Sequence, residues 1–88
     1  MEVPTEIHTR YLARRKEDLE KCLMNFQEHN FSALEKVGHQ LKGNGLTFGY
    51  QELSRIGSQL ESAAAYKDEA ELQKAINDFS CWVARHFN

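Results

Sequence analysis

The sequence predicts an all-α fold, an antiparallel up-down four-helix bundle. Apolar residues recur at spacings of three, four and seven in four consecutive segments, and none of these segments shows the alternation typical of a strand. The 88 residues include a single proline, and only short stretches separate the segments. Because amphipathic helices with short connections pack against one another, we expect one domain over residues 1–88.

The first helix is expected over residues 6–28 and the second over residues 30–46. The apolar positions of the first are Ile7, Tyr11, Leu12, Leu19, Leu23 and Phe26. Asn30 is a suitable N-cap for the second, because its side chain can accept a hydrogen bond from the first turn. At about 100° per residue, the buried side of the second helix consists of Leu34, Val37, Gly38, Leu41 and Gly45.

The third helix is expected over residues 50–66 and the fourth over residues 68–87. The third presents Leu53, Ile56, Leu60 and Ala64 at helical spacing, with Gly57 on the same side. Asp68 followed by Glu71 resembles a capping box at the start of the fourth. The inward positions of the fourth are Leu72, Ile76, Phe79, Val83 and Phe87.

Composition excludes several classes of protein. The net charge is −2 with mixed acids and bases, whereas nucleic-acid binders usually carry a basic stripe. The start lacks the apolar region of a signal peptide, and no run approaches the roughly 18 apolar residues of a membrane span, so a cytoplasmic protein is expected. Cys22 and Cys81 are too far apart for a redox or zinc motif and are expected to be free thiols facing the core. Four helices can complete their own core, which predicts a monomer.

All five glycines fall within one twenty-residue window. Gly38, Gly45 and Gly57 lie on or near buried faces, where a missing side chain lets helices approach closely. Gly49 is expected to end a helix or form a turn with positive φ. Gly43 is different, because at an exposed mid-helix position glycine costs about 0.5 to 1 kcal/mol relative to alanine. A requirement from outside the domain would explain it.

Gly43 lies one helical turn after His39, and both are expected to face solvent. Lys42 follows His39 by three residues and can place a cation beside the imidazole. Neutral imidazole is a competent nucleophile at pH 7 because its unperturbed pKa is about 6.5. Phosphoryl transfer to such a group needs positioning and charge stabilisation more than covalent help.

The sequence contains no P-loop and no evident magnesium cage. The phosphoryl donor and any metal would therefore come from a partner. We expect no cofactor in this chain, with Mg²⁺ bound only by the partner.

The run His39-Gln40-Leu41-Lys42-Gly43, followed by Gly49, Leu53, Leu60 and Glu61, resembles the signature of histidine-containing phosphotransfer (HPt) domains. The opening Tyr11-Leu12-Ala13-Arg14-Arg15, with Asp18 and Leu19, is similar to bacterial members. The resemblance implies a bundle whose exposed His39 accepts phosphate from a response-regulator receiver domain or a hybrid histidine kinase and passes it on. Lys42 would stabilise the phosphate charge, and Gly43 would give the receiver clearance. Gln40, where sensor kinases usually place an acid, favours a phosphoryl carrier without its own nucleotide site.

Residues around this motif are candidates for partner binding. They are Glu35, Lys36, Leu46, Arg14 and Arg15. Arg14 and Arg15 would form a basic edge near His39 if the first two helices are adjacent. A solvated charged face shared with Glu17 and Asp18 explains them equally well.

Three alternatives stay open. The chain fits a helical adaptor without phosphate chemistry, which leaves Gly43 unexplained, or a phosphoacceptor domain excised from a larger hybrid kinase. His8, His29 and His86 lie in different segments and are expected to be ordinary surface histidines; a zinc site would require the fold to bring them together.

Overall fold

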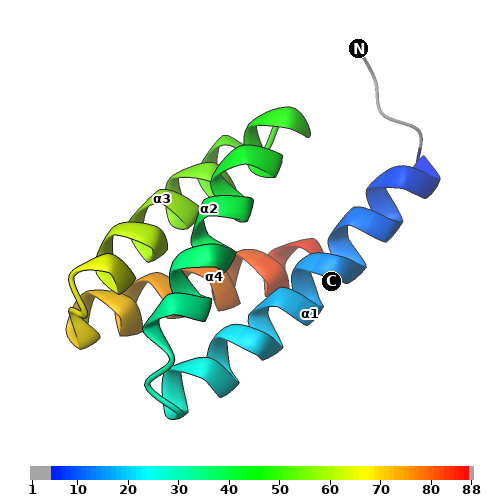
Figure 1. Ribbon diagram of the computed structural model, residues 1–88. Coiled ribbons are helices and arrows are strands. Elements are labelled where there is room, and N and C mark those ends of the chain that lie inside the picture. Colours follow the sequence, from blue (N-terminus) through cyan, green and yellow to red (C-terminus); the bar gives the residue numbers. More distant parts are fainter. Residues whose placement is uncertain (1–4, 88) are drawn as a thin grey trace.

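The computed structural model describes residues 5–87, which form four α-helices and no strand (Figure 1). The helices are α1 (Thr5–Gln27), α2 (Phe31–Thr47), α3 (Gln51–Ala65) and α4 (Glu69–His86). Every bound lies one residue from the position expected from the sequence, and three residues connect each helix to the next. Within the described range, no helix combines the length and apolar character that crossing a membrane requires.

The helices enclose one core. α2 and α3 make the most extensive contact, α3 packs on α4, and α1 lies against both α4 and α2. The buried side of α2 consists of the five residues that the sequence indicates, and the largest fully buried side chains of the protein are those of Trp82 and Phe79 on α4. Burial of such side chains contributes roughly 1.5 to 3 kcal/mol each to the free energy of folding.

The α2–α3 contact is close because three glycines lie in it. A methyl carbon added to Gly38 would lie 2.5 Å from the backbone nitrogen of Glu61, and one added to Gly57 would lie 2.5 Å from that of Lys42. An added methyl at Gly45 would lie 2.7 Å from the nitrogen of Ser54. The two backbones therefore approach more closely than side chains at these positions would permit.

Side-chain caps fix the starts of two helices. Asn30 Oδ1 accepts a hydrogen bond from Ala33 N at 3.2 Å, which confirms Asn30 as the N-cap of α2. Asp68 Oδ1 likewise accepts from Glu71 N at 3.1 Å. The backbone N–H of Asp68 donates to Ala63 O instead of the Glu71 side chain, so only one arm of the expected capping box forms. Gly49 has φ +82°, as expected for the turn after α2.

Three residues expected to face the core are substantially exposed. Ile7 is 45% exposed, Leu23 is 48% exposed and Phe87 is 44% exposed. Ile7 lies in the first turns of α1, and Phe87 follows the last turn of α4, where fewer neighbours cover a side chain. The Lys16 ammonium lies 5.5 Å from the centre of the Phe87 ring and supplies part of its cover.

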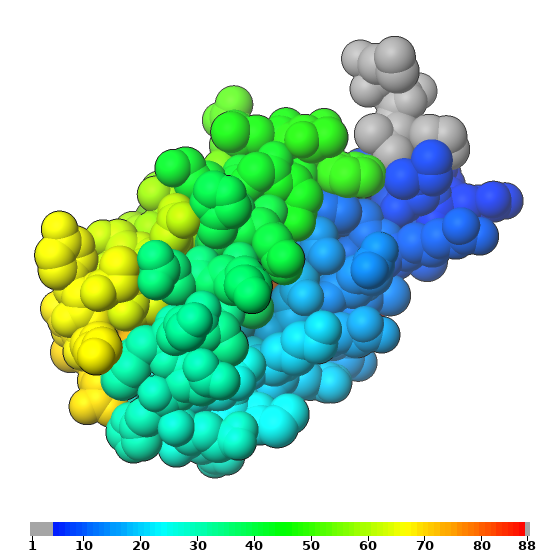
Figure 2. Space-filling view, viewed as in Figure 1, coloured from blue at the N-terminus to red at the C-terminus, as the bar shows by residue number. Residues whose placement is uncertain are grey.

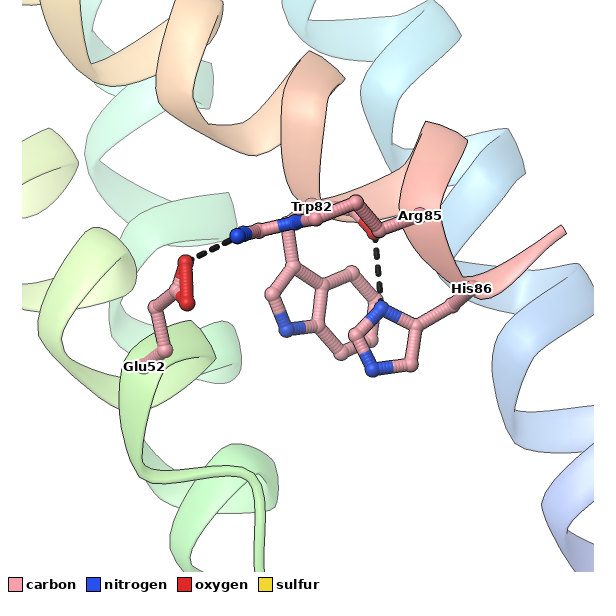
Figure 3. Close-up of polar contacts among 4 residues, drawn as sticks. All are labelled: Glu52, Trp82, Arg85 and His86. Carbon is pink, nitrogen blue, oxygen red and sulfur yellow. Dashed lines mark hydrogen bonds and ion pairs between the residues drawn. The ribbon is translucent and has the colours of Figure 1, made fainter. Parts of the chain in front are cut away.

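Polar contacts join the end of α4 to the start of α3 (Figure 3). Arg85 forms an ion pair with Glu52, and His86 Nδ1 donates to the Trp82 carbonyl at 2.8 Å. The His86 ring stacks on the Trp82 indole with centroids 4.0 Å apart, and the edge of Tyr50 completes the cluster. His86 is thereby engaged by its own helix and by aromatic neighbours.

The two thiols are free, but only Cys22 faces the core; the expectation was wrong for Cys81, which is exposed on α4. Burial raises the pKa of the Cys22 thiol to about 12, with the Asp18 charge adding to the shift. Because the thiolate is the reactive form, we expect a disulfide reagent at pH 8 to modify Cys81 rapidly and Cys22 only when the protein unfolds. Quantified thiol release with and without urea checks this, and rapid release of both thiols from the native protein would contradict it.

Candidate functional site

His39 is presented on the outer surface of α2. Its side chain is 74% exposed, while Gly38 and Leu41 on the same helix are buried. The helical repeat separates these neighbours, since residues one and two positions apart point to different sides of a helix. The imidazole is thus accessible to a macromolecule without any movement of the backbone.

One nitrogen of His39 is engaged by α3. His39 Nδ1 lies 2.8 Å from Glu61 Oε2, and because an ionised carboxylate only accepts, Nδ1–H is the donor. This bond selects the neutral tautomer in which Nε2 carries the lone pair. Within residues 5–87 Nε2 makes no hydrogen bond, so the nucleophilic nitrogen is free and directed away from Glu61.

The Gly38 contact explains how Glu61 reaches the imidazole. The missing side chain at Gly38 brings the α3 backbone at Glu61 against α2, one residue before His39. Glu61 is largely covered, with 28% of its side chain exposed, whereas His39 is open to solvent. The glycine contact and the carboxylate–imidazole bond are therefore parts of one arrangement.

On the exposed side of α2 around His39, one residue, Gly43, has no side chain, and two residues, Lys42 and Lys36, are basic. A methyl carbon added to Gly43 would find no neighbouring atom within 4 Å. Lys42 and Lys36 are exposed, three residues after and before His39, where helical geometry places them on adjoining sides of the imidazole. The surface combines an open approach with positive charge, which suits an anionic group carried by a large partner.

Three candidates for partner binding on α2 lie near the imidazole. Glu35 and Lys36 line a shallow hollow of about 290 Å³ together with His39 and Glu61. Leu46 is 63% exposed, one helical turn beyond Gly43, and is an apolar residue available for contact. The structure brings these residues to the same side of the helix as His39.

The two arginine candidates on α1 have different environments. Arg14 is exposed and lines a hollow between α1 and α2. Arg15 is only 8% exposed. Its Nε lies 2.8 Å from Asp18 Oδ2, at an angle that leaves the Nε–H without a hydrogen-bond acceptor. Desolvation raises the pKa of Asp18 and the Arg15 charge opposes that rise, so the pair belongs to the packed side of α1 and not to a fully solvated face.

The remaining histidines are separate from His39. His8 Nδ1 lies 2.9 Å from the Tyr50 hydroxyl, and His29 lies 3.0 Å from Glu69 Oε1. Among residues 5–87, no group of three or more His, Cys, Asp or Glu side chains is placed to hold a metal ion. The chemistry that this surface offers is nucleophilic attack by an exposed imidazole nitrogen.

The role of Glu61 is the part of the site that the residue pattern did not reveal. Its position in the motif was apparent, but the pattern assigned it no contact with His39. The available signal was the pairing of Gly38 with Gly57, since two glycines on facing buried sides indicate where two backbones meet.

The chain was compared with models of known protein families. The family model described as Hpt domain matches residues 6–82. No curated protein and no solved structure matches the chain significantly. The matched range contains α1 except Thr5, all of α2 and α3, and most of α4, and therefore every residue of the surface around His39.

Proposed function

Because the chain belongs to the Hpt domain family, a family of histidine phosphotransfer modules in phosphorelays, we propose that it carries a phosphoryl group on His39. The observation that carries the proposal is the state of the imidazole: exposed, held at Nδ1 by Glu61 and free at Nε2. The three-residue connections support the antiparallel up-down order of the bundle expected for such a domain.

The step begins with the lone pair on Nε2. Nε2 attacks phosphorus, the new N–P bond forms, and the bond between phosphorus and the aspartyl oxygen of a receiver domain breaks. The reverse step returns the phosphoryl group to an aspartate. Glu61 accepts the Nδ1–H bond in both states, and this charge-assisted bond strengthens as the imidazole becomes positive. Lys42 stabilises the oxygens of the transferred group.

The partner supplies the rest of the chemistry. A receiver domain or a hybrid histidine kinase provides the aspartyl phosphate or nucleotide, and Mg²⁺ is bound on the partner. The chain acts as a carrier and not as a nucleotide-dependent enzyme. Gly43 leaves room for the partner backbone beside His39.

The test is phosphorylation of the purified protein by a phosphoramidate donor and by a phosphorylated receiver domain. Wild type should gain one phosphoryl group by intact mass, and acid should remove it, as expected for an N–P bond. His39→Gln should gain none while remaining folded by circular dichroism. An unlabelled wild type, with donors active on a control protein, would overturn the proposal and favour a helical adaptor.

Glu61→Ala is expected to slow labelling by phosphoramidate about fivefold, because without the carboxylate the imidazole divides between its two neutral tautomers and rotates freely. Glu61→Gln retains an acceptor oxygen and should recover most of the rate. The ¹⁵N chemical shifts of the His39 ring report the tautomer directly. Glu20→Ala, a matched charge removal on the exposed side of α1, should change neither measurement; an unchanged ring spectrum in Glu61→Ala would exclude the positioning role.

Lys42→Ala is expected to slow transfer from a receiver domain about tenfold, because a cation beside the developing phosphoryl charge is lost. The free energy of unfolding should change little, since Lys42 is exposed. Rapid-quench kinetics with Lys74→Ala as the control measure the effect. Equal rates for wild type and Lys42→Ala would remove the assigned role.

A further inference from the structure

A second surface feature lies between α1 and α2. A hollow of about 460 Å³ opens there, lined by Ile7, Arg10, Tyr11, Arg14, Arg15, Gln40, Asn44 and Phe48. We call it the arginine hollow. Three of its residues are arginines and none is acidic, although the chain as a whole has a net charge of −2. Positive charge is therefore concentrated at this place.

The two outer arginines of the hollow form no ion pair with any residue that the structure describes. Within residues 5–87, neither Arg10 nor Arg14 has a carboxylate within 4.0 Å, and both side chains are exposed. The inner arginine, Arg15, is paired with Asp18. An arriving anion would therefore meet two guanidinium groups that no carboxylate of residues 5–87 engages, each able to form a two-pronged contact with a carboxylate.

The walls of the hollow are held in place before any ligand arrives. The Tyr11 hydroxyl donates to Asn44 Oδ1 at 2.6 Å, and the Tyr11 ring stacks on Phe48 with centroids 4.2 Å apart. The Arg15 guanidinium also lies over the Tyr11 ring, 4.5 Å from its centre. With Asn44 Oδ1 occupied by Tyr11, the amide group left for a ligand is the NH₂ donor.

The hollow adjoins the surface around His39. At about 100° per residue, Gly43, Gln40 and Asn44 lie about 40°, 100° and 140° around α2 from His39. Gly43 thus lies between the imidazole and the hollow, and a methyl carbon added there would have no neighbouring atom within 4 Å. Figure 2 shows the surface of α2 meeting that of α1 on this side of the molecule.

We propose that the arginine hollow receives an acidic side chain of the receiver domain that docks over His39, and that this contact selects among receivers; the proposal rests on the proposed function. The hollow presents guanidinium N–H donors, and no acidic side chain lines it. The surface at its border is apolar at the exposed Ile7 and, beyond Gly43, at the exposed Leu46. Arginine, aromatic and apolar residues around a polar contact are typical of a protein interface. An acidic side chain on a protein fits this open border and the charge of the hollow.

The contact between the arginine hollow and the receiver is expected to affect the affinity for the receiver and not the formation or cleavage of the N–P bond at His39. Arg10 and Arg14 approach α2 beside Gln40 and Asn44, while the nucleophilic nitrogen belongs to His39 on the other side of Gly43. A small phosphoramidate reaches His39 without covering the hollow. Transfer to or from a receiver domain requires docking, so its rate depends on both the surface around His39 and the arginine hollow.

The experiment compares Arg10→Glu/Arg14→Glu with Lys67→Glu/Lys74→Glu, a control that changes the net charge equally near the connection from α3 to α4. Each protein is labelled at His39 with phosphoramidate and then mixed with a receiver domain chosen from a panel because it takes phosphate from wild type. Rates are measured over a range of receiver concentrations. Circular dichroism verifies that each variant is folded.

In the arginine variant, the half-saturating receiver concentration should rise about tenfold or more, and the maximal rate should stay within about twofold of wild type. The lysine control should leave both quantities unchanged. The dependence of transfer on ionic strength should weaken in the arginine variant, because fewer charge contacts remain to be screened. Labelling by phosphoramidate should be equal in all proteins.

Unchanged receiver saturation in the arginine variant would overturn the proposal. An equal loss in the lysine control would also overturn it, because the effect would then follow net charge and not the hollow. Labelling of His39 with no transfer to any receiver in the panel would refute this interface while leaving carrier chemistry intact. Failure of phosphoramidate to label wild type would instead refute the proposed function.

Discussion

Gly43→Gln is expected to slow phosphoryl transfer between the protein and a receiver domain about 100-fold. The added side chain would stand one turn from His39 in space that is now empty. A partner displaced by even 1 Å loses the alignment that in-line transfer needs, and such losses are commonly of this size. The obstruction acts on docking, so labelling by the small phosphoramidate should remain within about twofold of wild type.

The same substitution should stabilise the protein. Glutamine is a better helix former than glycine, so the free energy of unfolding should rise by about 0.5 kcal/mol or more. Gly43→Ala is the control, because alanine also has a higher helix propensity than glycine but adds only a methyl group, which obstructs docking little. Receiver transfer by rapid quench and urea unfolding measure the two effects. Normal receiver transfer by a folded Gly43→Gln protein would show that Gly43 is not needed for clearance.

Gly38→Ala is expected to lower the free energy of unfolding by about 3 kcal/mol. Its methyl carbon would lie 2.5 Å from Glu61 N and 2.8 Å from Gly57 O. These are backbone atoms that cannot turn aside as a flexible side chain can, so α2 and α3 would have to separate. Overpacking against a fixed core commonly costs about 1 to 3 kcal/mol, and backbone contacts belong at the upper end.

This cost is large for an 88-residue chain, whose net stability is expected to be of the order of 5 to 15 kcal/mol. Urea unfolding of Gly38→Ala and Gly43→Ala provides the comparison, because the same chemical change is made in a closed and in an open place on one helix. We expect opposite signs. A Gly38→Ala protein as stable as wild type would mean that the close approach of the helices is not required.

Gly38→Ala should also disturb the site without touching the imidazole. Separation of α2 from α3 would carry Glu61 away from His39, and the ¹⁵N shifts of the ring should move toward those of Glu61→Ala. The glycines of this protein therefore have two roles. Those between α2 and α3 position the Glu61 carboxylate, and Gly43 leaves space for a partner to approach the His39 imidazole.

Much of this could be predicted from individual helices. The buried side of α2, the exposure of His39 and Gly43, the Asn30 cap and the positive φ of Gly49 follow from the helical repeat and from local backbone preferences. The predictions of burial were wrong at positions where the exposure of a side chain depends on how other helices pack against it. Cys81 is exposed on α4, and Ile7, near the start of α1, is 45% exposed.

Periodicity and local preferences in the sequence are enough to predict the four helices, the Asn30 and Asp68 N-caps, the buried side of α2, and the exposed His39 beside Gly43. Tertiary structure alone decided that Glu61 holds His39 Nδ1 and that Arg10 and Arg14 lie beside Asn44. The physical reason is that helical periodicity fixes the direction of a side chain around its own axis. It does not fix how far one helix is shifted along another, and that offset is set by close packing at Gly38, Gly45 and Gly57.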